Sequence, residues 1–166
     1  MLLYLMRHGR AEGAAPSRPD HARELTPAGR SEVEQIARAI QYTGWQAQRL
    51  LCSPYTRARQ TADCVASSIG CSIDVVSTLI PGFGLRELAE AINAVGSPEA
   101  VMVVAHQPSI GEVVARLTGS RVQVAPAAII AIEVARLRRG VGFLKGCYDP
   151  GTMARLGRAY EEVDPS

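Results

Sequence analysis

Short apolar segments alternate along this chain with longer segments in which apolar residues recur every three to four positions. The short segments have the length and composition of buried strands, and they lie at 2–6, 49–52, 73–76, 101–105, 128–134 and 142–148. Most of the segments between them have the spacing of amphipathic helices. Such an alternation predicts an α/β fold in which helices flank a mostly parallel central sheet.

Two of the predicted helices have clear boundary signals. Thr26 and Pro27 suit the N-cap and the first helical position, and Gly44 is placed to end that helix. Ser53 and Pro54 have the same chemistry, so we expect a second helix to begin there and to stop at Gly70. Further helices are expected over 85–95 and 110–117, and the tail from Asp149 is expected to lie on the surface.

Length and composition suit one ordinary globular domain, which we expect to span residues 1–166. The 166 residues are 47% hydrophobic and 20% charged, and neither a repeat nor a linker divides them. A net charge of +2 does not favour a nucleic-acid or membrane partner, and we expect the short basic stretch at 136–139 to be a solvated turn. The four cysteines form no Cys-x-x-Cys pair, which suits thiols in a reducing compartment, and the first apolar run is too short for a signal peptide. We therefore expect a cytoplasmic protein.

Polar residues that suit phosphate chemistry follow three of the predicted strands. Arg7-His8-Gly9 follows the first strand, Arg57 lies in the first turn of the helix after the second, and His106 follows the strand at 101–105. Ligands of such sheets bind at the carboxyl ends of the strands. A histidine can act as a nucleophile, an arginine offers a fork of donors to phosphate, and the first turn of a helix favours an anion. Together these residues predict a pocket for a phosphate dianion, in which we expect the anion to raise the pKa of His106.

A metal site is the alternative reading of the two histidines. His8 and His106 would be its ligands, but no third ligand lies at a fitting spacing, and the neighbouring arginines would repel a cation. We therefore expect neither a metal nor another cofactor.

The order of the motifs resembles that of the histidine phosphatase superfamily, also called phosphoglycerate mutase-like. The matching segments read L-M-R-H-G at 5–9, S-P-Y-T-R-A-R-Q-T-A at 53–62 and V-V-A-H-Q-P at 103–108. The resemblance implies that His8 attacks a phosphoryl group and carries it as phosphohistidine. It also implies that Arg7, Arg57 and His106 hold the phosphoryl oxygens, and that water then releases inorganic phosphate.

Two departures narrow the resemblance to the SixA-type phosphohistidine phosphatases. The loop at 79–84, where ordinary members have an acid that protonates an alcohol leaving group, has no carboxylate before Glu87. The chain also has no room for a large lid insertion. A P–N bond to imidazole needs less help from an acid than a P–O bond, and an open cleft admits a protein side chain. The resemblance thus implies a phosphohistidine-bearing protein, such as a histidine phosphotransfer domain, as the substrate.

The proton donor and the substrate remain open between alternatives. Asp20 is the first candidate for the acid and Glu12 the second, although either could be a solvated loop carboxylate, and His21 is expected at the surface. A small-molecule phosphomonoesterase, acting on a sugar or nucleotide phosphate, would use the same four core residues. A phosphoprotein-binding module without catalysis is the alternative of another class, against which the presence of His8 argues.

Overall fold

The computed structural model describes residues 1–163 of the chain, and these form a six-stranded sheet in the order β3-β2-β4-β1-β5-β6. The strands are β1 (Leu2–Arg7), β2 (Arg49–Cys52), β3 (Ile73–Val75), β4 (Ala100–Ala105), β5 (Ile129–Val134) and β6 (Gly142–Tyr148). Strands β3, β2, β4 and β1 pair in parallel, whereas β5 is antiparallel to both of its neighbours, β1 and β6. Five of the six described strands therefore run in one direction, which confirms the α/β fold with a mostly parallel sheet.

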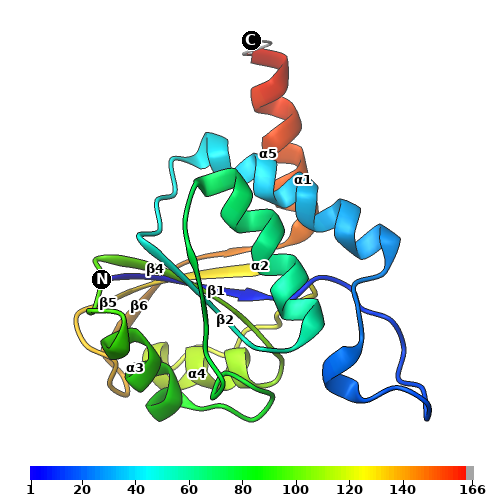
Figure 1. The fold of residues 1–166 in the computed structure, drawn as a ribbon. Helices are drawn as coiled ribbons and strands as arrows, with labels where there is room; N and C mark the ends of the chain where they lie inside the picture. Colours follow the sequence, from blue (N-terminus) through cyan, green and yellow to red (C-terminus); the bar gives the residue numbers. More distant parts are fainter. Residues whose placement is uncertain (164–166) are drawn as a thin grey trace.

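Helices cover both faces of the sheet. The first face carries α1 (Pro27–Thr43), α2 (Thr56–Ile69) and α5 (Pro150–Val163), and the second carries α3 (Leu85–Ala94) and α4 (Ser109–Thr118) (Figure 1). Each face has its own cluster of buried apolar side chains, because the strands are apolar on both sides. None of the helices in the described residues is long and apolar enough to cross a membrane.

The helix boundaries predicted from capping residues are correct at three of four places. Thr26 caps α1 by accepting a hydrogen bond from the Gly29 N–H at 3.0 Å, and Gly44 and Gly70 end α1 and α2 at φ 68° and 65°. The predicted start of α2 at Ser53 is wrong, because that helix begins at Thr56.

The physical reason is that Ser53 still belongs to the end of a strand. Its N–H donates to the Val104 carbonyl of β4 at 3.1 Å, as a further residue of β2 would. Its hydroxyl lies 2.7 Å from Nε2 of His106 and accepts from the Tyr55 N–H at 3.3 Å, before the first residue of the helix.

The expectation that the tail lies on the surface is also wrong, because residues 150–163 form α5. Met153 is fully buried, and Gly157 lies so close to α1 that a Cβ there would be 3.2 Å from the Cβ of Ala39. Met153 and Leu156 repeat at helical spacing and pack against the core of the first face. The tail is therefore part of the helical layer over that face.

The topology brings three strand ends to one place. β2, β4 and β1 are neighbours in the sheet and parallel, so the residues after Cys52, Ala105 and Arg7 meet at the same edge. The His8 N–H donates to the Ala105 carbonyl at 3.1 Å, which continues the ladder one residue past β1.

Candidate active site

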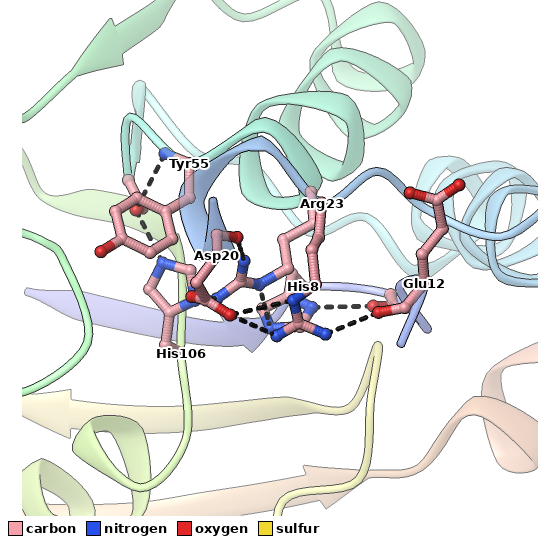
Figure 2. A network of polar contacts seen from close by, with 9 residues as sticks. His8, Glu12, Asp20, Arg23, Tyr55 and His106 are labelled. Atoms are coloured by element: carbon pink, nitrogen blue, oxygen red, sulfur yellow. Dashed lines mark hydrogen bonds and ion pairs between the residues drawn. The ribbon is translucent and has the colours of Figure 1, made fainter. Parts of the chain in front are cut away.

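His8, Arg57 and His106, predicted from separate motifs, come together at this edge of the sheet. Nε of Arg57 lies 3.1 Å from Nε2 of His8, and the centroids of the two histidine rings are 5.2 Å apart (Figure 2). Arg7 is the last residue of β1 and directly precedes His8. The structure therefore places the predicted core residues around one small region.

The His8 ring is held in one tautomer. Nδ1 lies 2.7 Å from the carbonyl oxygen of Gly9, and a carbonyl can only accept, so Nδ1 must carry the proton. Nε2 then carries no proton, and its lone pair accepts a hydrogen bond from the Nε–H of Arg57. Burial, reinforced by the nearby arginine charges, lowers the pKa of His8 to about 4, so the ring is neutral near pH 7.

Gly9 is needed for close packing beside this ring. A Cβ on Gly9 would lie 2.6 Å from the side chain of Val33 in α1, and the Gly9 N–H donates to the buried Thr61 hydroxyl at 3.1 Å. The loop after β1 is thus clamped between α1 and α2. This clamp fixes the carbonyl that orients the His8 ring.

Arg57 is buried and bonded at both ends of its guanidinium. Nη1 and Nη2 donate to the Asp20 carbonyl at 2.6 Å and to the Asp20 carboxylate at 3.0 Å, while Nε faces His8. The ring of Tyr55 lies 5.0 Å from the guanidinium carbon. A guanidinium held in this way keeps its fork of donors in a fixed orientation.

His106 is buried, and its ring is oriented by Ser53, which the sequence analysis placed at the start of a helix. Its Nε2 lies 2.7 Å from the hydroxyl of Ser53, and its ring meets that of Tyr55 at 5.0 Å. Its Nδ1 has no hydrogen-bond partner in the described part of the chain. Burial, with the charges of His8 and Arg57, lowers its pKa to about 3, so the ring is neutral before an anion enters.

Arg7 is fixed by the loop before β5. Its Nη1 donates to the Val124 carbonyl at 2.9 Å, and its buried Nε, like Nδ1 of His106, meets no partner among the described residues. Burial lowers the pKa of Arg7 from its ordinary value. Buried polar atoms in native proteins are nearly always paired. The Nε–H of Arg7 therefore suits a ligand oxygen, and so does Nδ1 of His106 when it carries the proton of its ring.

Of the two candidate acids, the structure brings Asp20 into the site and leaves Glu12 outside it (Figure 2). Asp20 belongs to a short 3₁₀ helix at Asp20–Ala22, and its carboxylate bridges Arg57 and Arg23 at 3.0 and 2.8 Å. Desolvation raises the pKa of Asp20, but the hydrogen bonds from the two arginines outweigh it and leave the pKa lowered. Asp20 is therefore ionised in this arrangement.

Glu12 makes its contacts within the loop and not with the residues of the pocket. Its carboxylate pairs with Arg18 and accepts from the Glu24 N–H, while its backbone carbonyl accepts from Arg23 at 2.6 Å. His21 is exposed, as expected, with its ring 6.1 Å from that of Tyr55.

Arg23 is the second site residue, after Ser53, that sequence reasoning missed. It lies three residues after Asp20 in the loop and holds both the Asp20 carboxylate and the Glu12 carbonyl. The stretch from Asp20 through Arg23 resembles the corresponding loop of the SixA-type group, but the sequence does not show which atoms Arg23 contacts. Only the folded loop brings its guanidinium to the site.

Neither a loop acid nor a metal site is evident among residues 1–163. Glu87, the first carboxylate after β3, caps α3 by accepting the Gly84 N–H at 2.9 Å, and it pairs with Arg86. No three His, Cys, Asp or Glu side chains in that range come together as metal ligands would. The site offers fixed cationic donors and, in His8, a neutral imidazole with an unprotonated Nε2, which suits attack on a bound phosphoryl group.

Comparisons with known proteins agree with this chemistry. The family model for the histidine phosphatase superfamily (branch 1) matches residues 3–81. The phosphohistidine phosphatase SixA of Escherichia coli K12 is 30% identical over 121 residues, which are 70% of this chain and 74% of the relative. An uncharacterised protein of Picosynechococcus sp. is 36% identical over 115 residues, 68% of this chain and 70% of that protein. The solved structure of the protein histidine phosphatase SixA complexed with tungstate superimposes with a TM-score of 0.81 at 27% identity, and the match covers 92% of this chain and 99% of that one.

Proposed function

This chain belongs to the histidine phosphatase superfamily as a SixA-type member, and from that premise we propose that it hydrolyses phosphohistidine on a protein through a phosphorylated His8. The observation that carries the proposal is the fixed tautomer of His8. The Gly9 carbonyl holds the proton on Nδ1, so the lone pair of Nε2 faces the donors of Arg57. A neutral, oriented imidazole next to cationic donors is what a nucleophile toward phosphorus requires.

In the first step, Nε2 of His8 forms a bond to phosphorus while the bond from phosphorus to the substrate nitrogen breaks. The electron pair of that bond goes to the leaving imidazole, which takes up a proton. Arg57, the free Nε–H of Arg7 and the free Nδ1 of His106 bind the phosphoryl oxygens. These donors stabilise the charge of the transition state without having to reorganise.

In the second step, water attacks the phosphorus of phosphorylated His8 and releases inorganic phosphate. The pair of electrons in the P–N bond returns to Nε2 of His8, and the Gly9 carbonyl keeps that ring in place for the next cycle. No metal or other cofactor takes part in either step of this proposal.

Asp20 is proposed as the acid once the phosphoryl group is bound. In the free site its carboxylate accepts a hydrogen bond from Nη2 of Arg57 and is ionised. A bound phosphoryl group would compete for this Arg57 N–H and would place a second negative charge near Asp20. Both effects raise the pKa of Asp20. Asp20 could then protonate the leaving nitrogen, and its ionised form could accept a proton from the attacking water.

Phosphohistidine is favoured over phosphate esters as the substrate, because the site has few carboxyl groups that can protonate a leaving group. The Glu87 carboxylate accepts a hydrogen bond at the start of α3. The ion pairs of Asp20 with Arg23 and Arg57 must weaken before its carboxylate can be protonated. An alkoxide leaving group depends strongly on a proton donor, whereas imidazole leaves more easily. A phosphohistidine-bearing protein in the cytoplasm, such as a histidine phosphotransfer domain, is therefore the proposed substrate, and residues 1–166 are proposed to act as a single domain.

A small-molecule phosphomonoesterase is the second candidate, because Asp20 does lie against Arg57 and could serve an ester as well. The test is a substrate panel with a phosphohistidine-bearing transfer domain, a phosphoserine peptide, a sugar phosphate and a nucleotide phosphate. We expect kcat/KM to be at least about tenfold higher for phosphohistidine, equivalent to about 1.4 kcal/mol. Equal or faster turnover of a small ester would favour the second candidate.

A further inference from the structure

We propose that a groove beside the active site, lined by Arg116, Arg121 and Arg139, binds an acidic segment of the protein substrate. This inference rests on the proposed function, because it concerns how a protein that carries phosphohistidine is held. The groove runs between α4 and the segment at 119–124 that follows it, and its first hollow, lined by Arg116 and Arg121, has a volume of about 480 Å³. A second hollow of about 350 Å³ continues it at the far end of α4.

One end of the groove adjoins the catalytic residues. Gln107 and Pro108 line it there, and they directly follow His106. The segment that forms the opposite wall continues to Val124, whose carbonyl binds Arg7. A protein chain that places its phosphohistidine on His8 would therefore lie close to the start of this groove.

The other end of the groove is where three arginines gather from separate parts of the chain. Arg116 belongs to α4, Arg121 to the segment after it, and Arg139 to the turn between β5 and β6. The Gly140 N–H donates to the Arg116 carbonyl at 2.9 Å, which holds that turn against α4. The basic turn that we expected to be simply solvated thus forms part of a wall.

The net charge of the groove lining is positive. All three arginines are exposed, and in the part of the chain that the structure describes none of them has a carboxylate oxygen within 4.0 Å. Glu112 is the acidic residue in the lining of the larger hollow. Unpaired arginines along a groove favour carboxylates on a partner, mainly by raising the rate of association.

The dimensions favour a peptide segment over a single small anion. With a rise of about 1.5 Å per residue, Arg116 lies about 10 Å along α4 from Ser109. An extended segment covers about 3.3 Å per residue, so acidic residues about three to five positions from the phosphohistidine would reach the arginines. Ala115 and Val122 supply an apolar wall for the aliphatic parts of such a segment.

The test compares three substrates at low and at high salt. The first is a phosphohistidine peptide with three Asp or Glu residues within about five positions of the phosphohistidine, the second is its Asn and Gln analogue, and the third is phosphoimidazole. The enzyme variants are R116S/R121S/R139S and a control, R30S/R38S/R158S. The control removes the same charge from exposed residues of α1 and α5, on the other face of the sheet.

We expect the wild type to prefer the acidic peptide by about tenfold in kcat/KM at about 20 mM salt, and by less than about threefold at about 200 mM. The groove variant should lose this preference, the control should keep it, and phosphoimidazole turnover should stay within about twofold in all three proteins. Equal turnover of the two peptides by the wild type, an equal loss in both variants, or a preference that survives in the groove variant would each overturn the docking proposal. Failure of the wild type to hydrolyse either peptide would instead overturn the proposed function, and the docking proposal with it.

Discussion

Arg57 donates its Nε–H to Nε2 of His8 across 3.1 Å, so one guanidinium touches the nitrogen that we propose as the nucleophile. The other end of the same group holds Asp20. A phosphoryl group that enters between them would draw these donors to its oxygens and free the lone pair of His8. Arg57 thereby links the orientation of the nucleophile to the binding of the anion.

We expect Arg57→Lys to lower kcat/KM by at least about a hundredfold. A lysine offers a single charged point, and it cannot reach His8, Asp20 and a phosphoryl oxygen at once as a planar fork does. The measurement is steady-state kinetics with one phosphohistidine substrate. Arg59→Lys is the matched control, because Arg59 lies exposed on the same helix, and it should change kcat/KM by less than about twofold. Comparable activity in the Arg57 and Arg59 variants would remove Arg57 from the mechanism.

Ser53 is expected to be a positioning residue, acting through His106. Ser53→Ala removes the hydroxyl 2.7 Å from Nε2, which leaves the buried ring without the group that orients its Nδ1 toward the substrate. We expect kcat to fall about tenfold with little change in KM, and Ser53→Thr to restore part of the loss. Ser67→Ala, a change on the exposed side of α2, should leave both constants unchanged. A variant that is merely less stable, with unchanged kcat at a temperature where it is folded, would contradict this role.

Asp20→Asn separates the two classes of leaving group. The asparagine keeps the shape of the side chain but cannot donate the proton of a carboxylic acid. We expect kcat/KM for a phosphate ester to fall at least about tenfold, and for phosphohistidine by less than about threefold. Glu12→Gln is the control in the same loop, and it should affect neither substrate. An equal loss for both substrates would contradict the claim that esters depend on this acid more strongly than phosphohistidine does.

The stability of the fold should depend on pH because of the buried histidines. Burial lowers the pKa of His8 to about 4 and that of His106 to about 3, from 6.5. Below pH 6.5 the unfolded chain therefore binds protons that the folded chain does not, so the free energy of unfolding decreases as the pH falls. We expect urea unfolding between pH 6.5 and 5 to show this decrease, in a range where carboxylates still contribute little.

His8→Asn provides the check on that pH dependence. It removes one of the two buried imidazoles, so the decrease between pH 6.5 and 5 should become shallower. His21→Asn changes an exposed histidine and should leave the slope as it is in the wild type. A slope that is the same in all three proteins would show that His8 does not contribute.

How far the sequence predicts the structure depends on whether the signal is local. Apolar strands and the cap at Thr26 are read from neighbouring residues, and the structure confirms them. Ser53-Pro54 misled because the Ser53 backbone still pairs with Val104 of β4, a contact far away in the sequence that a local motif does not reveal. The α5 helix has Met153 and Leu156 at helical spacing, but its partner Ala39 lies on α1, far away in the sequence.

In the candidate site, too, some residues can be predicted from local sequence signals and others only from the folded structure. His8, Arg57 and His106 follow strands that prove to be neighbours and parallel, so position along the chain was enough to predict that they meet. Arg23 acts through a loop whose path is set by contacts with Glu12 and Asp20, and no periodic pattern encodes that path.

The most direct test of the mechanism is to trap the phosphoryl group during turnover and to locate it. The reaction with a ³²P-labelled phosphohistidine substrate would be stopped in alkali, where phosphohistidine survives, and the protein would be digested and sequenced by mass spectrometry. We predict an acid-labile phosphoryl group on Nε2 of His8, since Nδ1 is bonded to the Gly9 carbonyl. His8→Ala should give neither label nor turnover, although the protein remains folded at neutral pH. Label on another residue, or substantial turnover by His8→Ala, would contradict the account.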